Sequence, residues 1–519
     1  MTSGTRIAVN AMATYGRTLL RIGLGIFSSR WVLQSLGEVD YGLLGVVGSL
    51  IVFITFLNSV ASGACSRFFA FSIGKKDIED LRRWFNAALS VHVILPLILI
   101  AIGWPIGEWA IDNFVKIPPD RLATAHWVFR FSLVASFWGM ASTPYMAMYT
   151  ATQNIAERTL WEIAHILVNF GFVYWLTTYR GDAWLMYSGF SVFVTVMLGM
   201  GQAISARIRF PGCRIMLRYW GDWQRLKQML SYSWWTLFGS LGYLARSQLP
   251  SVILNQYYPP MQYKYVNASY QVGGALASYT STFSNSLMGA FSPQITSLEG
   301  AGDRGGMVRT AFRASKFGVF MTLLVAIPVA LEVDYLLVLW LKTPPRLAGS
   351  FCLLVILQTI LDNLTFGHMT GILAGGNIKW YQVTTGTICF MSVPIAWIVL
   401  ALGGSPVSVS WVIAVCMAAC SMARLFFGRA LLGIGIRDWA RGVFLPIILV
   451  SAISAISGGC VQIFWREASF YRIVTTSCVC VSAMSGLAWV LLFDSQEKEV
   501  ILNVLHRISQ RISKKQQHA

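Results

Sequence analysis

The stretch VFLPIILVSAISAISGGCVQIFW, at residues 443–465, contains no acidic or basic side chain. A bilayer core is about 30 Å thick, so an α-helix needs about 20 apolar residues to cross it. Comparable charge-free stretches recur along the chain at residues 41–61, 183–203, 380–402 and 473–493. These runs predict an all-α fold in which many helices span a membrane.

The composition agrees with this fold class. Of 519 residues, 55% are hydrophobic and 12% are charged, against about 25% charged in ordinary soluble domains. The net charge of +18 is typical of nucleic-acid binders in soluble proteins, but here the topology of the loops is the better explanation. The nine Cys residues lie mostly inside apolar segments, without metal-ligand spacing. We therefore expect no metal site, no cofactor and no nucleic-acid partner.

Hydropathy predicts about fourteen spans. Two of them, at 11–34 and 265–290, are the least apolar because they contain Arg or Ser and Asn, so counts of twelve or thirteen stay open. The predicted spans lie near residues 11–34, 41–62, 85–111, 122–146, 158–178, 183–205, 229–254, 265–290, 314–341, 347–370, 379–402, 407–431, 442–465 and 471–493.

Lys and Arg gather in alternate connectors, which predicts how the chain is oriented. The most basic connectors are at 67–83, 207–227, 304–316 and 424–441. Basic loops stay in the cytoplasm, so we expect these connectors and both termini there, in a multi-pass protein of the cytoplasmic (inner) membrane. The opposite connectors hold only Lys116, Arg121, Arg180, Lys264, Lys342, Arg346, Arg466 and Arg472.

An internal repeat predicts how the spans are grouped. Gly74, Asp77 and Arg83 recur as Gly300, Asp303 and Arg309, an offset of about 226 residues. Each copy follows the second helix of a six-helix group, which predicts two pseudo-symmetric lobes. The expected parts are an N-terminal lobe at 1–205, a cytoplasmic linker at 206–228, a C-terminal lobe at 229–431, two extra spans at 432–493 and a basic amphipathic tail at 494–519.

Two segments carry a family resemblance. They are RWVLQSLGEVDYG at 30–42 and SRFFAFSIG at 66–74, which a charged segment follows at 75–83. They resemble polysaccharide and lipid-linked oligosaccharide flippases, such as O-antigen flippases, of the multidrug/oligosaccharidyl-lipid/polysaccharide exporter (MOP) superfamily. The residue-level similarity covers about residues 12–90. Beyond this segment, only the number and layout of the spans agree. The resemblance implies a V-shaped pair of six-helix bundles, two extra C-terminal helices, and alternating access for an isoprenoid-pyrophosphate-linked glycan.

Five arginines inside the predicted spans are the candidate substrate-binding residues. An Arg near a helix centre costs about 2.5 to 3.5 kcal/mol on insertion scales, so such residues point to function. Sliding by the repeat offset brings Arg21 beside Arg246, which predicts a cationic cavity between the lobes. Arg binds phosphate through two parallel hydrogen bonds, so this cavity suits a pyrophosphate. The weaker candidates are Arg17, Arg30 and Arg130, and for Arg17 and Arg30, which lie toward opposite ends of their helix, snorkelling to the interface is the favoured explanation.

Acidic residues inside the predicted spans are fewer. Glu162 and Asp362 are expected either to pair with cavity arginines or to bind a coupling ion, and intramembrane charges usually pair with one another.

The sequence thus predicts a flippase that moves a lipid-linked oligosaccharide for cell-surface polysaccharide synthesis, with the bilayer and this substrate as partners. A glycan polymerase or glycosyltransferases are further candidate partners. A multidrug and toxin extrusion exporter shares the architecture, but it is expected to carry a carboxylate-lined cation site, and the first four spans hold arginines instead.

A membrane enzyme of glycan assembly needs a nucleotide-sugar domain or a sizeable outer loop, and the outer connectors are short and lack the usual catalytic motifs. We therefore expect no enzymatic activity. A non-transporting scaffold is disfavoured because buried arginines are costly to keep.

Overall fold

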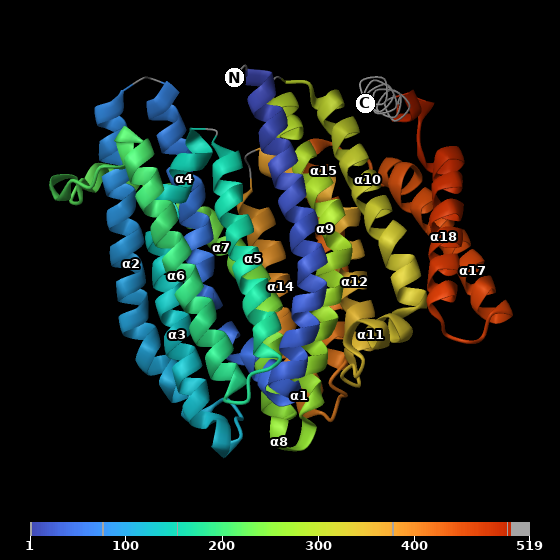
Figure 1. The fold of residues 1–519 in the computed structure, drawn as a ribbon. Helices are drawn as coiled ribbons and strands as arrows, with labels where there is room; N and C mark the ends of the chain where they lie inside the picture. Colours follow the sequence, from blue (N-terminus) through green and yellow to red (C-terminus); the bar gives the residue numbers. More distant parts are fainter. Residues whose placement is uncertain are drawn as a thin grey trace, which may run out of the picture. The chain divides into compact units, whose positions relative to one another are not determined.

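The computed structural model describes residues 3–74, 77–152, 154–300, 302–375, 378–495 and 497–499. Within these ranges the chain is helical and contains no β-strand (Figure 1). The helices are α1 (Ser3–Gly74), α2 (Ile78–Asn113), α3 (Leu122–Ala141), α4 (Thr143–Ala151), α5 (Ile155–Leu176), α6 (Ala183–Arg209), α7 (Trp223–Tyr257), α8 (Pro260–Tyr263), α9 (Tyr265–Gly300), α10 (Arg304–Leu331), α11 (Val333–Leu341), α12 (Ala348–Leu364), α13 (Phe366–Ala374), α14 (Lys379–Ala401), α15 (Ser408–Leu432), α16 (Ile436–Trp439), α17 (Leu445–Phe464) and α18 (Phe470–Leu487).

Eight helical segments of the described chain are long and apolar enough to cross a membrane. The count is nine if α12 and α13, which meet at a 46° bend, form one broken span. The five other predicted spans also coincide with helices, which are α1 for two of them, α3 with α4, α7, and α9. The prediction of an all-α, polytopic membrane fold is confirmed, whereas a total of fourteen spans stays a prediction.

A single glycine divides the first two predicted spans. α1 consists of two helices that meet at a kink, where Gly37 has the non-helical angles φ 75° and ψ 174°. L-residues rarely adopt a positive φ, whereas glycine does so without steric cost. A Cβ on Gly37 would meet nothing within 4 Å, so backbone conformation, and not space, requires the glycine.

The repeated Asp residues begin helices. The carboxylate of Asp77 accepts a hydrogen bond from the backbone N–H of Asp80 at the start of α2. Asp303 does the same for Gly306 at the start of α10. Asp is a preferred N-cap because its side chain satisfies a backbone donor that the helix leaves unpaired. The repeat therefore marks two equivalent helix starts.

The helices form two compact units. The first unit comprises Met1–Ala275, Leu337–Cys352 and Gln382–Cys416, and the second comprises Leu276–Leu336, Leu353–Tyr381 and Met417–Ala519. The boundaries of these units differ from those of the predicted lobes and linker, which stay predictions. The predicted tail at 494–519 lies outside the described residues, apart from 494, 495 and 497–499.

Connectors of the first unit meet in two groups at its opposite ends. At one end, Arg121 pairs with Asp40 at 2.8 Å and with Asp182 at 3.4 Å, which joins three predicted outer connectors. At the other end, Asn86 donates to the carbonyl of Arg214 at 2.8 Å, close to the start of α2. This alternation is what successive membrane crossings require.

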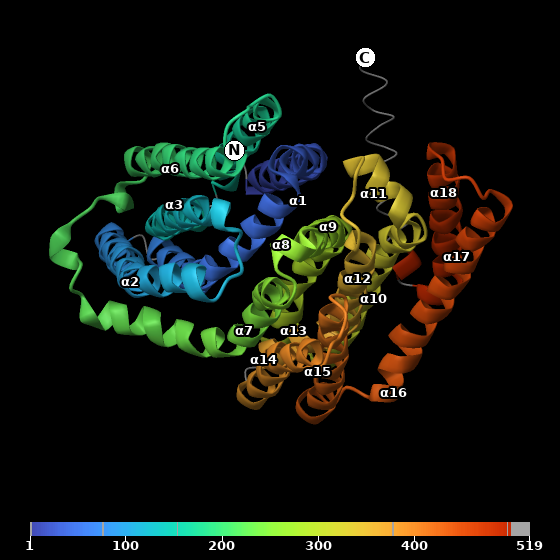
Figure 2. The ribbon, with the colours of Figure 1, turned by 90° about the horizontal axis from the view of Figure 1, so that it is seen from below.

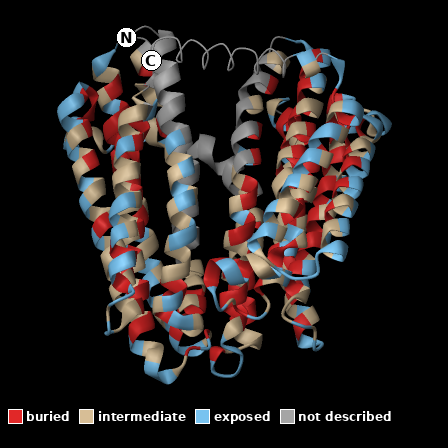
Figure 3. Ribbon diagram, turned by 45° about the vertical axis from the view of Figure 1, so that its right-hand side comes forward, coloured by how far each residue is buried: buried red, intermediate tan, exposed pale blue. Residues whose placement is uncertain are grey.

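Apolar side chains remain exposed along the length of the helices. On α2 they include Ile94, Leu97, Ile98, Ile102 and Ile106, each about half exposed or more. Figure 3 shows exposed positions between buried ones along whole helices, and not only near their ends. A hydrocarbon solvent makes such exposure favourable, because lipid tails are as apolar as these side chains.

Candidate functional site

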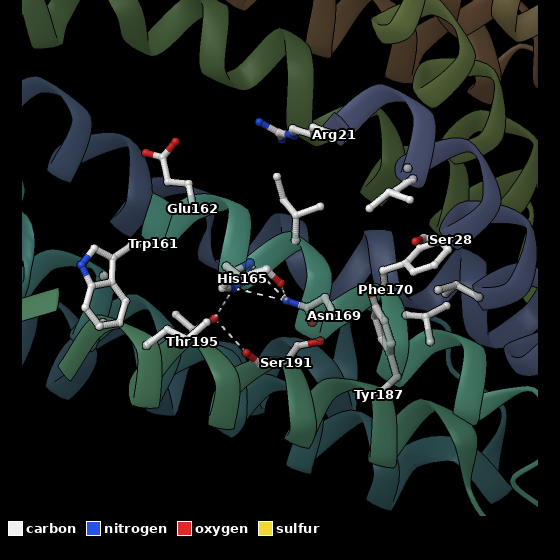
Figure 4. Close-up of a pocket in the computed structure, with 18 of the residues that line it drawn as sticks. Arg21, Ser28, Trp161, Glu162, His165, Asn169, Phe170, Tyr187, Ser191 and Thr195 are labelled. Atoms are coloured by element: carbon white, nitrogen blue, oxygen red, sulfur yellow. Dashed lines mark hydrogen bonds between the residues drawn. The ribbon is translucent and has the colours of Figure 1, made fainter. Parts of the chain in front are cut away.

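A cavity of about 1060 Å³ lies within the first unit, where α1, α3, α5 and α6 surround it (Figure 4). Three helices line it through residues spaced three or four apart, and such residues share one helix face. The residues are Arg17, Arg21, Ser28 and Val32 on α1; Arg158, Trp161, Glu162, His165 and Asn169 on α5; and Tyr187, Ser191 and Thr195 on α6. We call it the polar cavity.

One part of the polar cavity is charged. Glu162 pairs with Arg17, and its other carboxylate oxygen lies 3.0 Å from Nε of Arg158. Arg21 lies one helical turn beyond Arg17 on the same face of α1 and is exposed to the cavity. No described carboxylate pairs with it. Three guanidinium groups therefore face one carboxylate, which leaves an excess of positive charge.

The other part is neutral and polar. Nδ2 of Asn169 lies 3.1 Å from Nδ1 of His165, and Nε2 of His165 lies 3.5 Å from Oγ1 of Thr195. Nδ2 of Asn169 also donates to the backbone carbonyl of His165 at 3.0 Å. Figure 4 shows this chain of polar groups continuing from α5 to Ser191 on α6. It presents amide, imidazole and hydroxyl groups side by side.

Aromatic rings border the neutral part. Trp161, Phe170 and Tyr187 line the cavity together with Trp138 of α3. A Cβ on Gly199 would collide with the indole of Trp138, so the glycine lets this ring lie against α6. Flat aromatic faces beside amide and hydroxyl groups form an amphipathic surface.

The structure brings only some of the predicted residues to the polar cavity. Arg17, Arg21 and Glu162 line it, whereas Arg30 and Arg246 do not. Arg246 lies over the ring of Tyr243, 5.7 Å from its centroid, and its Nε is buried without a partner in the described chain. The Nε of Arg30 is likewise buried and without a described partner.

Arg130 lies elsewhere and is already occupied. Its Nε and Nη2 donate to the two carboxylate oxygens of Glu108 at 2.8 and 3.2 Å. The rings of Trp127 and Trp104 flank its guanidinium, at 5.2 and 6.0 Å. Glu108 of α2 therefore neutralises Arg130 within the α2–α3 pair, and a role for Arg130 in substrate binding stays a prediction.

Asp362 belongs to the second unit and pairs with Arg424 at 2.7 Å. The sequence placed Arg424 in a basic connector, and this assignment is wrong. Arg424 lies inside α15 with a side chain that is 0% exposed. Glu162 thus pairs with a predicted cavity arginine, whereas the partner of Asp362 is an arginine that was not among the candidates, and ion coupling by either carboxylate stays a prediction.

Several cavity residues were missed in the sequence. Arg158 was assigned to a connector, and Asn169, Ser191 and Thr195 were not singled out. Their signal is polar residues at helical spacing inside apolar segments, Glu162, His165 and Asn169 on α5 and Ser191 and Thr195 on α6. A polar stripe of this kind indicates a face that avoids lipid.

No family model and no curated protein sequence matches the chain. Solved structures do match in fold. One described as lipid II flippase MurJ in an inward closed conformation has a TM-score of 0.65 at 13% identity, over 93% of this chain and 98% of that one. An inward-facing multidrug resistance MATE family transporter of the MOP superfamily has a TM-score of 0.60 at 14% identity, over 80% and 94%. A MATE protein in a bent conformation has 0.54 at 16%, over 87% and 100%. The chain thus has the fold of these transporters, as the resemblance to the MOP superfamily implied.

Proposed function

We propose that this chain is a flippase that moves an isoprenoid-pyrophosphate-linked oligosaccharide across the cytoplasmic membrane, in the synthesis of a cell-surface polysaccharide. The observation that carries the proposal is Arg21, a guanidinium inside a membrane protein that faces a large cavity and has no described carboxylate partner. A charge at this depth is costly unless a ligand uses it.

The charge balance of the polar cavity favours an anionic cargo. Arg17, Arg21 and Arg158 outnumber Glu162, so a cationic drug would meet net repulsion there. Guanidinium groups bind phosphate oxygens through parallel, charge-assisted hydrogen bonds. Arg21 and Arg17 would hold the pyrophosphate, with Arg158 beside them. Arg246 and Arg30 stay candidates for the same role, whereas the contacts of Arg130 speak against it.

The neutral part of the cavity suits the sugars. Asn169, Ser191 and Thr195 offer donors and acceptors to hydroxyl groups, and Trp161 and Phe170 offer apolar faces. Phosphate and sugar would therefore bind next to each other, in the order in which such a substrate carries them.

The transport step would be alternating access, in which lobes rock around a site near the membrane midplane. Both termini would face the cytoplasm, where glycosyltransferases build the substrate, and a glycan polymerase would receive it on the other side. The solved structures of similar fold include a lipid II flippase, which supports a lipid-linked cargo, and a MATE transporter, which keeps drug export as the alternative.

The test is flipping of a fluorescent lipid-pyrophosphate oligosaccharide by the full chain in proteoliposomes, with binding of inorganic pyrophosphate measured by calorimetry. We expect Arg21→Ala to lose both. Arg180→Ala is the matched control, because Arg180 is exposed in the connector before α6, outside the cavity. Wild-type flipping and pyrophosphate binding by well-folded Arg21→Ala would overturn the proposal, as would transport of cationic drugs without any flipping.

A further inference from the structure

A second cavity, of about 450 Å³, lies in the first unit. None of the described residues that line it is charged. Its walls are Leu241, Gly242, Leu244, Ala245, Gln248 and Leu249 of α7, Gly386, Thr387 and Phe390 of α14, and Ser49 of α1. We call it the apolar cavity.

Two glycines produce this cavity. A Cβ on Gly242 would collide with the carbonyl oxygen of Gly386, so the backbones of α7 and α14 touch at this point. Figure 2 shows the two helices side by side. Small residues permit such close crossings in membranes. Crossing helices separate on either side of their contact, and the larger side chains Leu241, Leu244 and Phe390 wall the space that opens there.

The cavity lies beside the middle of a helix that can cross a membrane. α14 is one of the helices that can cross a membrane, and Gly386, Thr387 and Phe390 lie near the middle of its length. Thr387 and Phe390 are exposed, so the mouth of the cavity opens on the outer face of the helix. Lipid chains surround a membrane helix at the middle of its length, and a lining whose polar side chains are only Ser49, Gln248 and Thr387 offers water few hydrogen-bond partners. A hydrocarbon chain is the chemically matched occupant.

The apolar cavity adjoins the polar cavity along α1. Gly45 lines the polar cavity, and Ser49, one turn further on, lines the apolar one. The hydroxyl of Ser49 donates to the carbonyl of Gly45 at 2.8 Å. Gln271 also lines the polar cavity and lies against Gly45, where its amide would collide with an added Cβ. A ligand with a charged head and an apolar tail can therefore reach both cavities past one turn of α1.

We infer that the apolar cavity binds the isoprenoid chain of the substrate, next to the pyrophosphate held by Arg21. This inference rests on the proposed function. An engineered apolar cavity of about 150 Å³ holds one benzene. A cavity of about 450 Å³ therefore has room for about three groups of that size, roughly three isoprene units by the same measure.

The test compares two ligands on two variants of the full chain in detergent. Thr387→Phe fills the mouth of the apolar cavity from an exposed position, and Met391→Phe, one turn further along α14 and also exposed, is the matched control outside the lining. We expect Thr387→Phe to raise the Kd for a long-chain polyprenyl pyrophosphate about tenfold and to leave the Kd for inorganic pyrophosphate unchanged. Met391→Phe should change neither.

These outcomes separate the two proposals. If the wild-type protein does not bind inorganic pyrophosphate, the proposed function is overturned together with this inference. If pyrophosphate binds but Thr387→Phe leaves the Kd for polyprenyl pyrophosphate unchanged, only the tail site is overturned. A second measurement guards against misfolding: a polyprenyl pyrophosphate with a photoreactive group near the phosphate should label residues 241–249 or 386–390 in the wild-type protein. Equal labelling by a photoreactive phospholipid that polyprenyl pyrophosphate does not displace would identify the occupant as bulk lipid and refute the inference.

Discussion

Arg21 in the first unit and Arg424 in the second are both arginines within membrane helices, yet their surroundings are opposite. Arg424 is 0% exposed, and its guanidinium contacts the carboxylate of Asp362 at 2.7 Å, the carbonyl of Asp362 at 3.1 Å and the hydroxyl of Thr365 at 3.2 Å. Arg21 faces a cavity and pairs with no described carboxylate. A buried charge that has partners belongs to the structure, whereas one left open is available to a ligand.

The role of Arg424 follows from the break between α12 and α13. A break leaves backbone carbonyls without helical partners, and at membrane depth each must be satisfied by protein. The hydroxyl of Ser421 donates to the carbonyl of Leu361 at 2.6 Å, and the indole of Trp439 donates to that of Leu364 at 3.1 Å. Together with Arg424, these side chains hold the bend in place.

The largest expected effect is the loss of folded protein when Arg424 is replaced. Arg424→Ala leaves Asp362 without its cation, and the carbonyl of Asp362 loses a donor. Removing one partner of a buried pair costs about 3 to 5 kcal/mol, so we expect severe loss of folded protein. Membrane abundance and the Tm in detergent measure it. Arg424→Lys should recover part of the loss, and normal abundance of Arg424→Ala would remove the structural role.

Arg21 should behave in the reverse manner. Arg21→Ala is expected to leave the Tm unchanged, because no described ion pair is lost, while pyrophosphate binding weakens about tenfold or more. That factor corresponds to one charge-assisted contact of about 1.5 to 3 kcal/mol. Activity should fall in the order Arg, Lys, Ala, since Lys keeps the charge but loses the planar fork. A large drop in Tm would show that the two arginines do not differ as proposed.

A third buried charge extends the comparison beyond the membrane core. Asp40 lies in the connector between the first two spans, and burial raises its pKa from 3.8 to about 6, although Arg121 at 2.8 Å opposes this shift. The folded state therefore binds a proton more tightly than the unfolded state does. The protonated Asp40 carboxyl therefore stabilises the folded state fully below pH 3.8, and this contribution is lost as the pH rises to about 6.

We expect the free energy of unfolding to fall by an amount on the order of 1 to 2 kcal/mol across this pH window. Asp40→Asn, which cannot ionise, should flatten the profile, and Asp182→Asn serves as the comparison because it removes a neighbouring carboxylate that is less buried. Denaturation in detergent at several pH values measures both. An unchanged slope in Asp40→Asn would contradict the assignment.

The smallest expected effect concerns Glu162, the carboxylate that competes with a ligand for two arginines. Glu162→Gln frees Arg17 and Arg158, so pyrophosphate should bind a few-fold more tightly, at a cost in stability of about 1 kcal/mol for the partly exposed pairs. Calorimetry with inorganic pyrophosphate measures the gain. Weaker binding would mean that Glu162 orients the arginines and does not compete with the ligand.

The fold was largely predictable, because twenty-residue apolar runs, basic connectors and Asp helix caps are local signals. The break at Thr365 was not, since the hydropathy of 347–370 is continuous across it. Arg424 was misplaced for a related reason: counting basic residues by connector cannot detect a carboxylate that lies 62 positions away in sequence and beside it in space.

The candidate site was predictable in part. Arg17, Arg21 and Glu162 are conspicuous because each carries a charge inside a predicted span. Which of them share a cavity depends on how three helix faces converge, and this is tertiary information. The pairing of Arg130 with Glu108, 22 residues away on another helix, is of the same kind.

Gly37 also bears on how the chain enters the membrane during synthesis. The helix before it carries Arg17, Arg21 and Arg30, and each Arg at the centre of a segment opposes insertion by about 2.5 to 3.5 kcal/mol. The helix after it contains the charge-free stretch 41–61. Because a single residue interrupts the helical backbone between them, the second segment can carry the first across as a helical hairpin. A nascent chain that ends at residue 36 should therefore insert poorly, and one that ends at residue 74 should insert well, as glycosylation mapping in microsomes would measure.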